Sequence, residues 1–451
     1  YHRINHFAQR PHKVIFLIVC TLFDEKALKI ITSLISTGYV QYFITQCKML
    51  FYSLEFLLFF LPICLMGWHF LQTRRSHESS FRWLVLCSLF FYSWWNPTYL
   101  IFIVFSILFN FFVGKSLHRS KSKKLLFTGI AINLGFLGYF KYFHFLNTVV
   151  GLDFNTANIV LPLAISFFTF QQVTYIIDVY RNEAHDYTLT HYSLFVSFFP
   201  QLIAGPIVHH KEMMPQFDSS GHKGFQAKNF SVGITLLILG LFKKIVLADF
   251  LSKYASGIFG LAAENHELSL IESWAGALAY TFQLYFDFSG YVDMAAGVAR
   301  MFGITLPVNF LSPYKARSII DFWHTWHITL GRFLRDYVYI PLGGSKKGSA
   351  IKFCNLFLTM FIGGIWHGAG WTFLVWGALH GVYLIINHGW RGLTKKASSL
   401  HSFTQTKTFW VSSWALTFLG VVVSWVLFRA TSLQAAIQVL KGMIGLNGIE
   451  L

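Results

Sequence analysis

The chain has 451 residues, of which 55% are hydrophobic and 12% are charged, and its mean hydropathy is +0.52. Soluble domains carry about 25% charged residues, so this composition excludes an ordinary soluble enzyme and predicts a polytopic membrane protein. The formal net charge is +17, but no basic soluble domain is present to carry it. Nucleic-acid binding is therefore not expected.

The first 48 residues differ in pattern from the rest of the chain. Their two weak apolar runs are interrupted by Asp24, Glu25 and Lys26, and neither has the small-residue cleavage site of a signal peptide. A strongly apolar pattern begins at Met49. We therefore expect residues 1–48 to be an atypical extension, with the natural start at Met49, and residues 49–451 to form one membrane domain.

Apolar runs suited to helices follow one another from about position 50. A spanning helix needs about 20 mostly apolar residues, and by that rule the runs allow roughly ten to twelve spans. The runs lie near residues 50–72, 81–96, 98–114, 125–143, 158–178, 190–208, 231–260, 271–286, 291–306, 353–390 and 408–429. The predicted fold is thus all-α, a bundle of transmembrane helices with added re-entrant or interfacial helices.

Two short basic segments predict the orientation of this bundle. Residues 72–82 (QTRRSHESSFR) and 115–124 (KSLHRSKSKK) flank two apolar runs that are joined by the turn pair Asn96-Pro97. Two helices joined by a tight turn return the chain to its starting side. Both basic segments then face the cytoplasm by the positive-inside rule, and the positive charge reflects topology.

The aromatic segment 282–314 carries two carboxylates, Asp287 and Asp293. They could form a proton path or a cation site. Pairing with the arginines at 332 and 335 is the simpler interpretation, because a buried charge without a partner costs several kcal/mol.

The segment 321–344, DFWHTWHITLGRFLRDYVYIPLGG, contains two histidines in an aromatic setting. The spacing predicts a helix that places Asp321 and His324 on one face, with His327 one turn further along. The alternative is an interfacial amphipathic helix in which Trp323 and Trp326 form an aromatic belt. Such a belt does not need histidines.

The same segment is also basic. Arg332 and Arg335 follow the histidines, Asp336 is adjacent, and Lys346 and Lys347 lie just beyond. This charge pattern predicts a position near the cytoplasmic face. The arginines suit phosphate geometry, so they are candidates for binding a phosphorylated ligand; the competing view is that they only hold helices together.

The segment 361–388 places His367 inside an apolar, glycine-rich run that should lie deep in the bilayer. Gly364 and Gly368 have G-x-x-x-G spacing, which lets neighbouring helices approach closely. An ionisable residue at that depth is a functional candidate by default. For His380 and His388, nearer the far end of the segment, we favour a hydrogen-bonded core role.

Several well-known catalytic signatures are absent from the sequence. It contains no G-x-S-x-G elbow, no H-E-x-x-H pair, no Walker loop and no nucleotide fingerprint. His324 and His327 could be half of a metal site, but the carboxylate of an E-x-x-H type is missing, so we predict no metal. A deeply placed histidine then most simply acts as a general base on an alcohol.

At these residues the sequence resembles the membrane-bound O-acyltransferase family, in its bacterial polysaccharide branch typified by the alginate O-acetylase. The resemblance runs from about Met49 to Leu446. The blocks that carry it are FFPQLIAGPIV (198–208), QLYFDFSGYVDMAAGVARMFGI (283–304), PVNFLSPY (307–314), the 321–344 segment and GGIWHGAGWTFLVWGALHG (363–381). Family members commonly continue past residue 448 with further helices, so we expect the chain to be truncated at its carboxyl end.

The resemblance implies roles for particular residues. The family's W-H-x-(S/T)-L block falls on Trp326 to Leu330 and marks His327, and its W-H-G block marks His367 as the residue usually assigned as catalytic. His324 falls where relatives carry other residues. The candidate substrate-binding residues are Arg332, Arg335, Trp326 and Asp336. The resemblance also implies a funnel through the membrane that joins a cytosolic acyl donor to an extracytoplasmic acceptor.

The expected function is therefore transfer of an acetyl group, with acetyl-CoA as donor and no bound cofactor, for O-acetylation of an exported polysaccharide. Alginate is the first expected acceptor; peptidoglycan, cellulose and teichoic-acid D-alanylation remain alternatives. The branch also implies a periplasmic acetyltransferase partner and a location in the bacterial inner membrane, in contact with lipid.

A secondary transporter that couples ions through Asp287, Asp293 and Arg335 is a remote alternative. It predicts paired broken helices in two related halves, and we find no such internal symmetry.

Overall fold

The computed structural model describes residues 49–449 except 75–76, 152–153, 157–158, 186, 204, 219–223 and 397. The predicted extension 1–48 lies outside the described residues. The described part is built from helices and contains no β-strand, which confirms the predicted all-α class.

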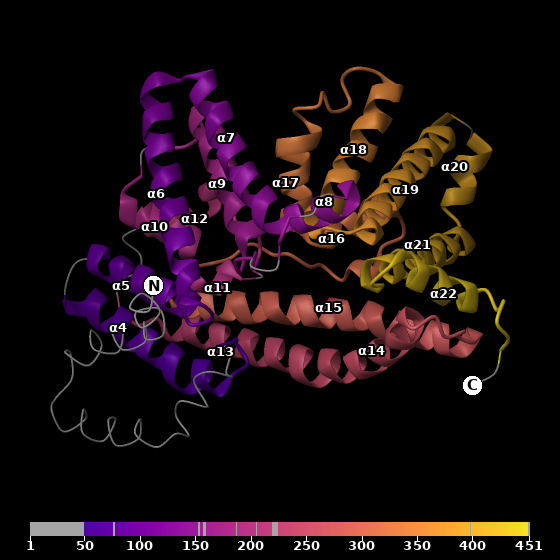
Figure 1. Ribbon diagram of the computed structural model, residues 1–451, viewed down its shortest axis with the longest axis horizontal. Helices are drawn as coiled ribbons and strands as arrows, with labels where there is room; N and C mark the ends of the chain where they lie inside the picture. The colour runs from indigo at the N-terminus through magenta and orange to yellow at the C-terminus, as the bar shows by residue number, and fades with distance from the viewer. Residues whose placement is uncertain are drawn as a thin grey trace.

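The amino-terminal half contains the following helical elements, drawn from indigo to pink in Figure 1: η1 (Phe56–Phe60), α4 (Leu61–Arg74), α5 (His77–Ser93), α6 (Pro97–Ser120), α7 (Lys123–Leu137), η2 (Gly138–Tyr142), α8 (Phe143–Val150), α9 (Ile165–Tyr180), α10 (Leu189–Ser197), α11 (Phe199–Leu202) and α12 (His210–Asp218).

The carboxyl-terminal half continues with α13 (Ala227–Leu241), η3 (Phe242–Ala248), α14 (Asp249–Ala263), α15 (Leu270–Met301), η4 (Pro313–Lys315), α16 (Ile319–Thr325), α17 (Ile328–Leu334), η5 (Arg335–Tyr339), α18 (Ser349–His367), α19 (Trp371–Lys396), α20 (Ser398–Thr404), α21 (Lys407–Arg429) and α22 (Leu433–Met443).

Six helical stretches of the described chain are long and apolar enough to cross a membrane: 56–73, 97–120, 123–150, 227–263, 349–367 and 407–429. Other apolar runs of the sequence form shorter helices, such as α5 with 17 residues and α9 with 16. The runs at 271–286 and 291–306 join into the single 32-residue helix α15.

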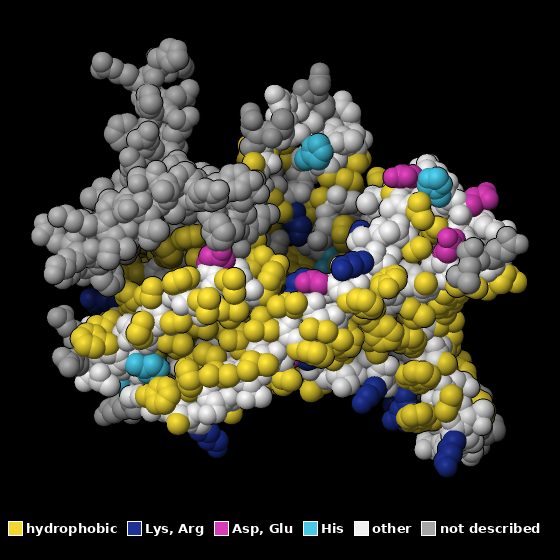
Figure 2. All heavy atoms as spheres, turned by 90° about the horizontal axis from the view of Figure 1, so that it is seen from below, with side chains coloured by type: hydrophobic (Ala, Val, Ile, Leu, Met, Phe, Trp, Pro, Cys, Tyr) yellow, Lys and Arg dark blue, Asp and Glu magenta, His cyan; other side chains and the backbone are white. Residues whose placement is uncertain are grey.

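Two long helical stretches form the base of the molecule in Figure 1. One runs through α13, η3 and α14, and it lies alongside the other, α15. Glycines allow this close approach: a Cβ atom at Gly290 would lie 2.9 Å from the Gly240 carbonyl oxygen, and one at Gly297 would lie 2.8 Å from the Leu237 nitrogen. Seen from below, this face is covered mainly by hydrophobic side chains (Figure 2). Exposed apolar side chains such as Ile238 and Phe250 are those expected to face lipid.

The carboxylates of α15 are paired, as predicted, but the predicted partners are wrong. Asp287 Oδ1 lies 2.6 Å from Lys244 Nζ and Asp293 Oδ2 lies 2.5 Å from Lys243 Nζ, both across the η3–α15 packing. Arginines 332 and 335 pair elsewhere. The reason is proximity, since η3 lies directly against α15 and brings two lysines to the carboxylates.

The predicted continuous helix through the histidine segment is also wrong. α16 ends at Thr325, Trp326 is extended, and His327 adopts a left-handed conformation with φ 44° before α17 begins at Ile328. Asn309 from a distant segment fixes the break, because its backbone oxygen accepts from the Ile328 N–H at 3.0 Å. His324 and His327 therefore do not share a helix.

The buried apolar residues form two large clusters: one joins the amino-terminal half to α13 and the carboxyl-terminal end of α15, and the other joins α14 and the first part of α15 to α16, α19, α21 and α22. A third, small cluster lies between elements of both halves. Its buried members are Phe170 of α9, Ile207, Leu330, Phe333 and Leu334 of α17, and Trp366 of α18. This cluster joins the two halves beside the site described next.

Candidate active site

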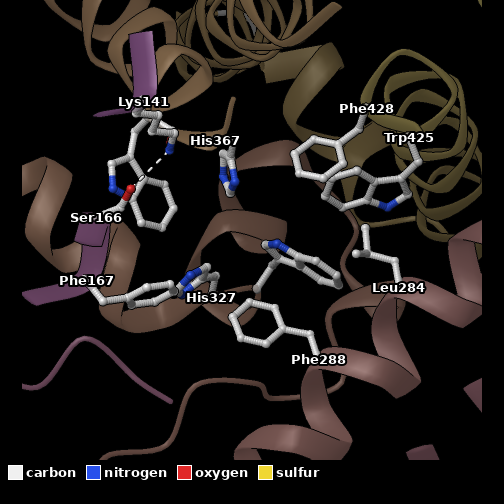
Figure 3. A pocket seen from close by; sticks show the side chains of 11 residues that line it. Lys141, Ser166, Phe167, Leu284, Phe288, His327, His367, Trp425 and Phe428 are labelled. Atoms are coloured by element: carbon white, nitrogen blue, oxygen red, sulfur yellow. Dashed lines mark hydrogen bonds between the residues drawn. The ribbon is translucent and has the colours of Figure 1, made fainter. Parts of the chain in front are cut away.

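A cavity of about 270 Å³ lies where the two halves of the chain meet (Figure 3). Its walls come from η2, α9, α15, the α16–α17 break, α18 and α21. They consist of Lys141, Ser166, Phe167, Leu284, Phe288, Trp326, His327, Trp366, His367, Trp425 and Phe428. Among these lining residues there is no carboxylate, and most side chains are aromatic. The cavity is therefore a nearly apolar chamber that contains two imidazoles and one ammonium group.

His367 is the last residue of α18, so its ring projects from a helix end into the cavity. Three aromatic rings frame the imidazole edge to face: Trp366, Trp376 and Phe428, with centroids at 4.9, 5.0 and 5.1 Å. Among the described residues, no hydrogen bond is made by its ring nitrogens. The imidazole is thus held in orientation by packing, while its nitrogens remain available to a reactant.

Close packing of α18 against α19 sets the position of His367. A Cβ atom at Gly377 would lie 2.6 Å from the Met360 carbonyl oxygen and 3.0 Å from the Gly364 Cα. Only glycine at these two positions allows the backbones to approach so closely, in agreement with the close approach predicted from the glycine spacing.

His327 is almost completely buried, with 2% of its surface exposed. It reaches the cavity because the helix break places it in the left-handed region, an uncommon conformation for a residue with a side chain. Its ring contacts Phe288 at 4.8 Å between centroids and Trp366 at 6.3 Å. Trp366 thus contacts both cavity histidines.

A hydrogen-bond network fixes which nitrogen of His327 carries the proton. Asn309 Oδ1 accepts from the Thr329 backbone N–H at 3.1 Å, so this atom is an oxygen acceptor. His327 Nδ1 lies 3.3 Å from the same oxygen and therefore donates. The Nε2 atom is left as the acceptor, and burial favours the uncharged ring because it penalises the charged form.

Lys141 is a cavity residue that the sequence interpretation missed. Its ammonium donates to Ser166 Oγ at 3.1 Å and to the backbone oxygen of Trp366, next to His367. An ammonium has three N–H donors, so one remains for a group in the cavity. The signal was present in the sequence, because a lysine inside the apolar run 125–143 is expensive and marks a functional candidate.

The structure brings together three of the six predicted site residues. Trp326, 4% exposed, lines the cavity with His327 and His367. Arg332, Arg335 and Asp336 do not line it. Arg335 is paired with its neighbour Asp336 at 2.7 and 3.0 Å.

Arg332 has a partner that the sequence did not suggest. Its Nη1 lies 2.6 Å from Glu212 Oε1, so this ion pair ties α17 to α12. His324 is exposed and lies outside the cavity.

His380 is a hydrogen-bonded core residue. Its Nε2 lies 3.0 Å from Ser424 Oγ, and its Nδ1 accepts from Trp323 Nε1 at 3.3 Å. His388 Nδ1 lies 3.3 Å from Lys352 Nζ. Neither residue lines the cavity.

The site can support acyl transfer. A neutral imidazole in a nearly apolar cavity is suited to take a proton from a hydroxyl, and a fixed ammonium beside it is suited to stabilise a developing oxyanion. The fold and this chamber define a multi-pass membrane protein in which two histidines line one nearly apolar cavity.

Comparison with known proteins agrees with this class. The sequence model of MBOAT, the membrane-bound O-acyltransferase family, matches residues 34–428 of this chain. The chain therefore belongs to the membrane-bound O-acyltransferase family, and it is an acyltransferase.

Individual relatives agree with the family match. The chain is 44% identical over 437 residues to a peptidoglycan O-acetyltransferase of Helicobacter pylori, covering 89% of this chain and 81% of the relative. It is 39% identical over 417 residues to a probable alginate O-acetylase of Pseudomonas putida, covering 89% and 82%. A teichoic acid D-alanyltransferase of Streptococcus thermophilus is 27% identical over 280 residues, covering 59% and 68%.

Proposed function

We propose that this acyltransferase transfers acetyl groups from acetyl-CoA for the O-acetylation of a polysaccharide outside the cytoplasmic membrane. One observation carries the proposal: His327, His367 and Lys141 converge on one small chamber lined by aromatic side chains. Such a chamber excludes water, which would otherwise hydrolyse the acyl group.

His367 is the general base in this proposal. Its uncharged ring takes the proton from the acceptor hydroxyl as the oxygen attacks the thioester carbonyl carbon. The carbonyl oxygen becomes an oxyanion, and the free N–H of the Lys141 ammonium stabilises it. When the tetrahedral intermediate collapses, the C–S bond breaks, and the proton on His367 passes to the leaving CoA sulfur. Each proton and electron pair is then accounted for within the cavity.

His327 has an orienting role. Because Asn309 fixes its Nδ1–H, its Nε2 presents a lone pair towards the cavity in one defined direction. That lone pair can accept a hydrogen bond from the acceptor or assist the proton transfer. The aromatic faces of Trp326 and Phe288 provide the walls against which the short acetyl chain packs.

The donor is expected to reach the cavity from the cytoplasmic side. Lys346 and Lys347 are exposed at the start of the segment that leads into α18, and α18 ends at His367. Their charge would raise the local concentration of a phosphate-rich donor. The two arginines are less suited to this role than the sequence suggested, because both are already paired with carboxylates.

Peptidoglycan is our first candidate acceptor and alginate the second. The support is the higher identity to the peptidoglycan O-acetyltransferase, 44% against 39%, at the same 89% coverage of this chain. This order differs from the expectation from sequence, which placed alginate first. Teichoic-acid D-alanylation is less favoured, because that relative matches 59% of the chain, and cellulose has no support among these relatives. A periplasmic acetyltransferase completes the proposal: its hydroxyl accepts the acetyl group in the cavity, and it then passes the group to the polysaccharide. The proposed location is the bacterial inner membrane.

The test uses a deletion strain of the source bacterium complemented with the wild-type chain or the His367→Gln variant. Muropeptides are analysed by mass spectrometry for O-acetylated muramic acid, and exported polysaccharide is analysed for ester acetate. The proposal expects acetylated muramic acid with the wild-type chain only. Acetate on another polymer with unmodified muropeptides would overturn peptidoglycan as the acceptor, and acetylation by the His367→Gln variant would overturn the role of the base.

A further inference from the structure

A second group of histidines lies outside the cavity. Asp178 near the end of α9, His209, and His210 at the start of α12 each direct one ligand atom to a common point, and these atoms all lie within 4.8 Å of one another. His209 Nε2 lies 2.8 Å and His210 Nε2 lies 2.9 Å from Asp178 Oδ2. Asp178 and His210 are buried, with 1% and 0% of their surface exposed.

We propose that these three residues form a binding site for a divalent transition metal ion, with Zn²⁺ as the first candidate. Two imidazole nitrogens and one carboxylate oxygen are a common ligand set for Zn²⁺, with bond lengths of about 2.0–2.2 Å. A tetrahedral ion with such bonds separates its ligand atoms by about 3.3 Å. The two histidine–aspartate separations would widen by about half an ångström to admit the ion, and the two imidazole nitrogens already lie within 4.8 Å of each other.

The hydrogen bonds of Asp178 favour an ion over a purely hydrogen-bonded cluster. Its Oδ2 atom is approached by both imidazoles and by the Tyr337 hydroxyl at 2.8 Å, while its buried Oδ1 atom has no partner among the described residues. A carboxylate that only accepted hydrogen bonds would be expected to share three donors between its two oxygens. The buried Oδ1 atom beside two imidazoles therefore keeps lone pairs that a bound cation would engage.

Neighbouring groups orient the proposed ligands. The Tyr187 hydroxyl lies 3.3 Å from His210 Nδ1, the ring nitrogen that would not bind the metal. Such an outer hydrogen bond fixes the orientation of a metal-binding imidazole. The Lys211 backbone N–H donates to His209 Nδ1 at 3.4 Å, so the Nε2 atom of His209 carries the proton in the metal-free site and would release it when a metal binds.

The proposed site links α9, which lines the reaction cavity, to α12 and η5. Tyr337, which contacts Asp178 and His209, belongs to η5, directly after α17. Two residues before His209, the Ile207 N–H donates to Thr329 Oγ1 at 3.0 Å, and Thr329 Oγ1 donates to Asn309 Oδ1, the acceptor of His327. A metal here would brace the segment that positions His327, so its role is structural.

The position of the site indicates where the metal would enter. The Lys121 ammonium, from the basic segment predicted to face the cytoplasm, donates to the Val179 backbone oxygen at 2.8 Å, one residue from Asp178. The cluster is therefore on the side of the basic loops, and we expect it to load from the cytoplasm.

The test measures metal in the full chain purified in detergent and exposed to Zn²⁺ alone. We expect about one Zn²⁺ per chain by elemental analysis, as for a closed protein site, and a d–d absorption band after replacement by Co²⁺. His210→Gln and Asp178→Asn should lower the metal content at least about tenfold. The matched control is His185→Gln, an exposed histidine in the loop after α9, which should leave the metal content unchanged.

Two results would overturn the site. One is a wild-type chain that holds less than about a tenth of an ion after Zn²⁺ loading, which would leave a hydrogen-bonded cluster only. The other is a His210→Gln or Asp178→Asn variant that keeps its metal. If those variants fail to accumulate, chelation of the wild-type chain replaces them: removal of the metal should lower the melting temperature, and added Zn²⁺ should restore it. An unchanged melting temperature would also overturn the site.

Discussion

The molecule contains two pairs of histidines whose surroundings differ in one respect. The cavity pair, His327 and His367, has aromatic rings, an amide and one ammonium around it, and no carboxylate lines the chamber. The second pair, His209 and His210, shares the buried carboxylate of Asp178. Without a carboxylate nearby, a buried imidazole stays uncharged and can take a proton. A buried carboxylate instead holds neighbouring imidazoles in a fixed position through hydrogen bonds. Histidine is thus suited to proton transfer in the cavity and to stabilising the structure at Asp178.

The largest expected effect separates the cavity pair from ordinary core histidines. His367→Gln should lower the rate of acetyl transfer by about 10² to 10⁴, the usual contribution of a general base. The control is His380→Gln, which changes a buried histidine that is fully hydrogen-bonded and lies outside the cavity. Transfer is measured with labelled acetyl-CoA and purified protein, normalised to folded chain. Comparable loss in both variants would mean that packing, not proton transfer, accounts for the effect.

The next effect concerns the cation of the cavity. Lys141→Met keeps the length of the side chain but removes the ammonium, so the rate should fall by about 10² to 10³, as for a lost oxyanion partner. Lys141→Arg keeps a charge and should recover part of the rate. Measured with the same assay, a Lys141→Met variant of normal activity would show that this cation serves only to bond Ser166 and the Trp366 backbone.

A smaller effect is expected for His327. Exchange to Gln removes the oriented Nε2 lone pair and should slow transfer by about tenfold to a hundredfold. His324→Gln, in the same aromatic segment but exposed, should have no effect on transfer. Both are compared by polymer acetyl content in a complemented deletion strain. Equal loss in the two variants would contradict the geometry, because only His327 reaches the cavity.

The smallest effect concerns the approach of the donor. Lys346→Ala together with Lys347→Ala should raise the KM for acetyl-CoA severalfold, more at low salt, with little change in kcat. Arg335→Ala should have little effect on accumulation, since its exposed pair with Asp336 is worth less than about 1 kcal/mol. Arg332→Ala should instead lower accumulation, since it breaks the link between α17 and α12. An unchanged KM at low salt in the lysine variant would remove these lysines from the donor path.

The all-α class could be predicted from the sequence, and so could the two segments that carry the cavity histidines, because both features depend on local sequence. Apolar runs set helices, and His367 stands out as an ionisable group in such a run. The helix break at His327 was not predictable, because Asn309, the residue that holds it, is 18 positions away in the chain. The partners of Asp287 and Asp293 also depend on tertiary packing, namely of η3 on α15.

The two missed features had different causes. Lys141 could have been predicted as a functional candidate, because it is a lysine within an apolar run of the sequence. The Asp178 cluster carried almost no signal in the sequence, because an aspartate near one helix end and a His-His pair about 30 residues later acquire meaning only when α9 and α12 lie side by side. Chemistry that depends on one residue can be predicted from sequence; chemistry that depends on convergence cannot.

One measurement tests the division of roles between the two pairs most directly: transfer rate and bound metal determined on the same purified preparations of wild type, His367→Gln and His210→Gln. The account predicts that His367→Gln loses transfer by about 10² to 10⁴ and keeps its full metal content, whereas His210→Gln loses the metal. A His367→Gln protein that transfers acetyl at the wild-type rate, or that loses its metal while His210→Gln keeps it, would contradict the account.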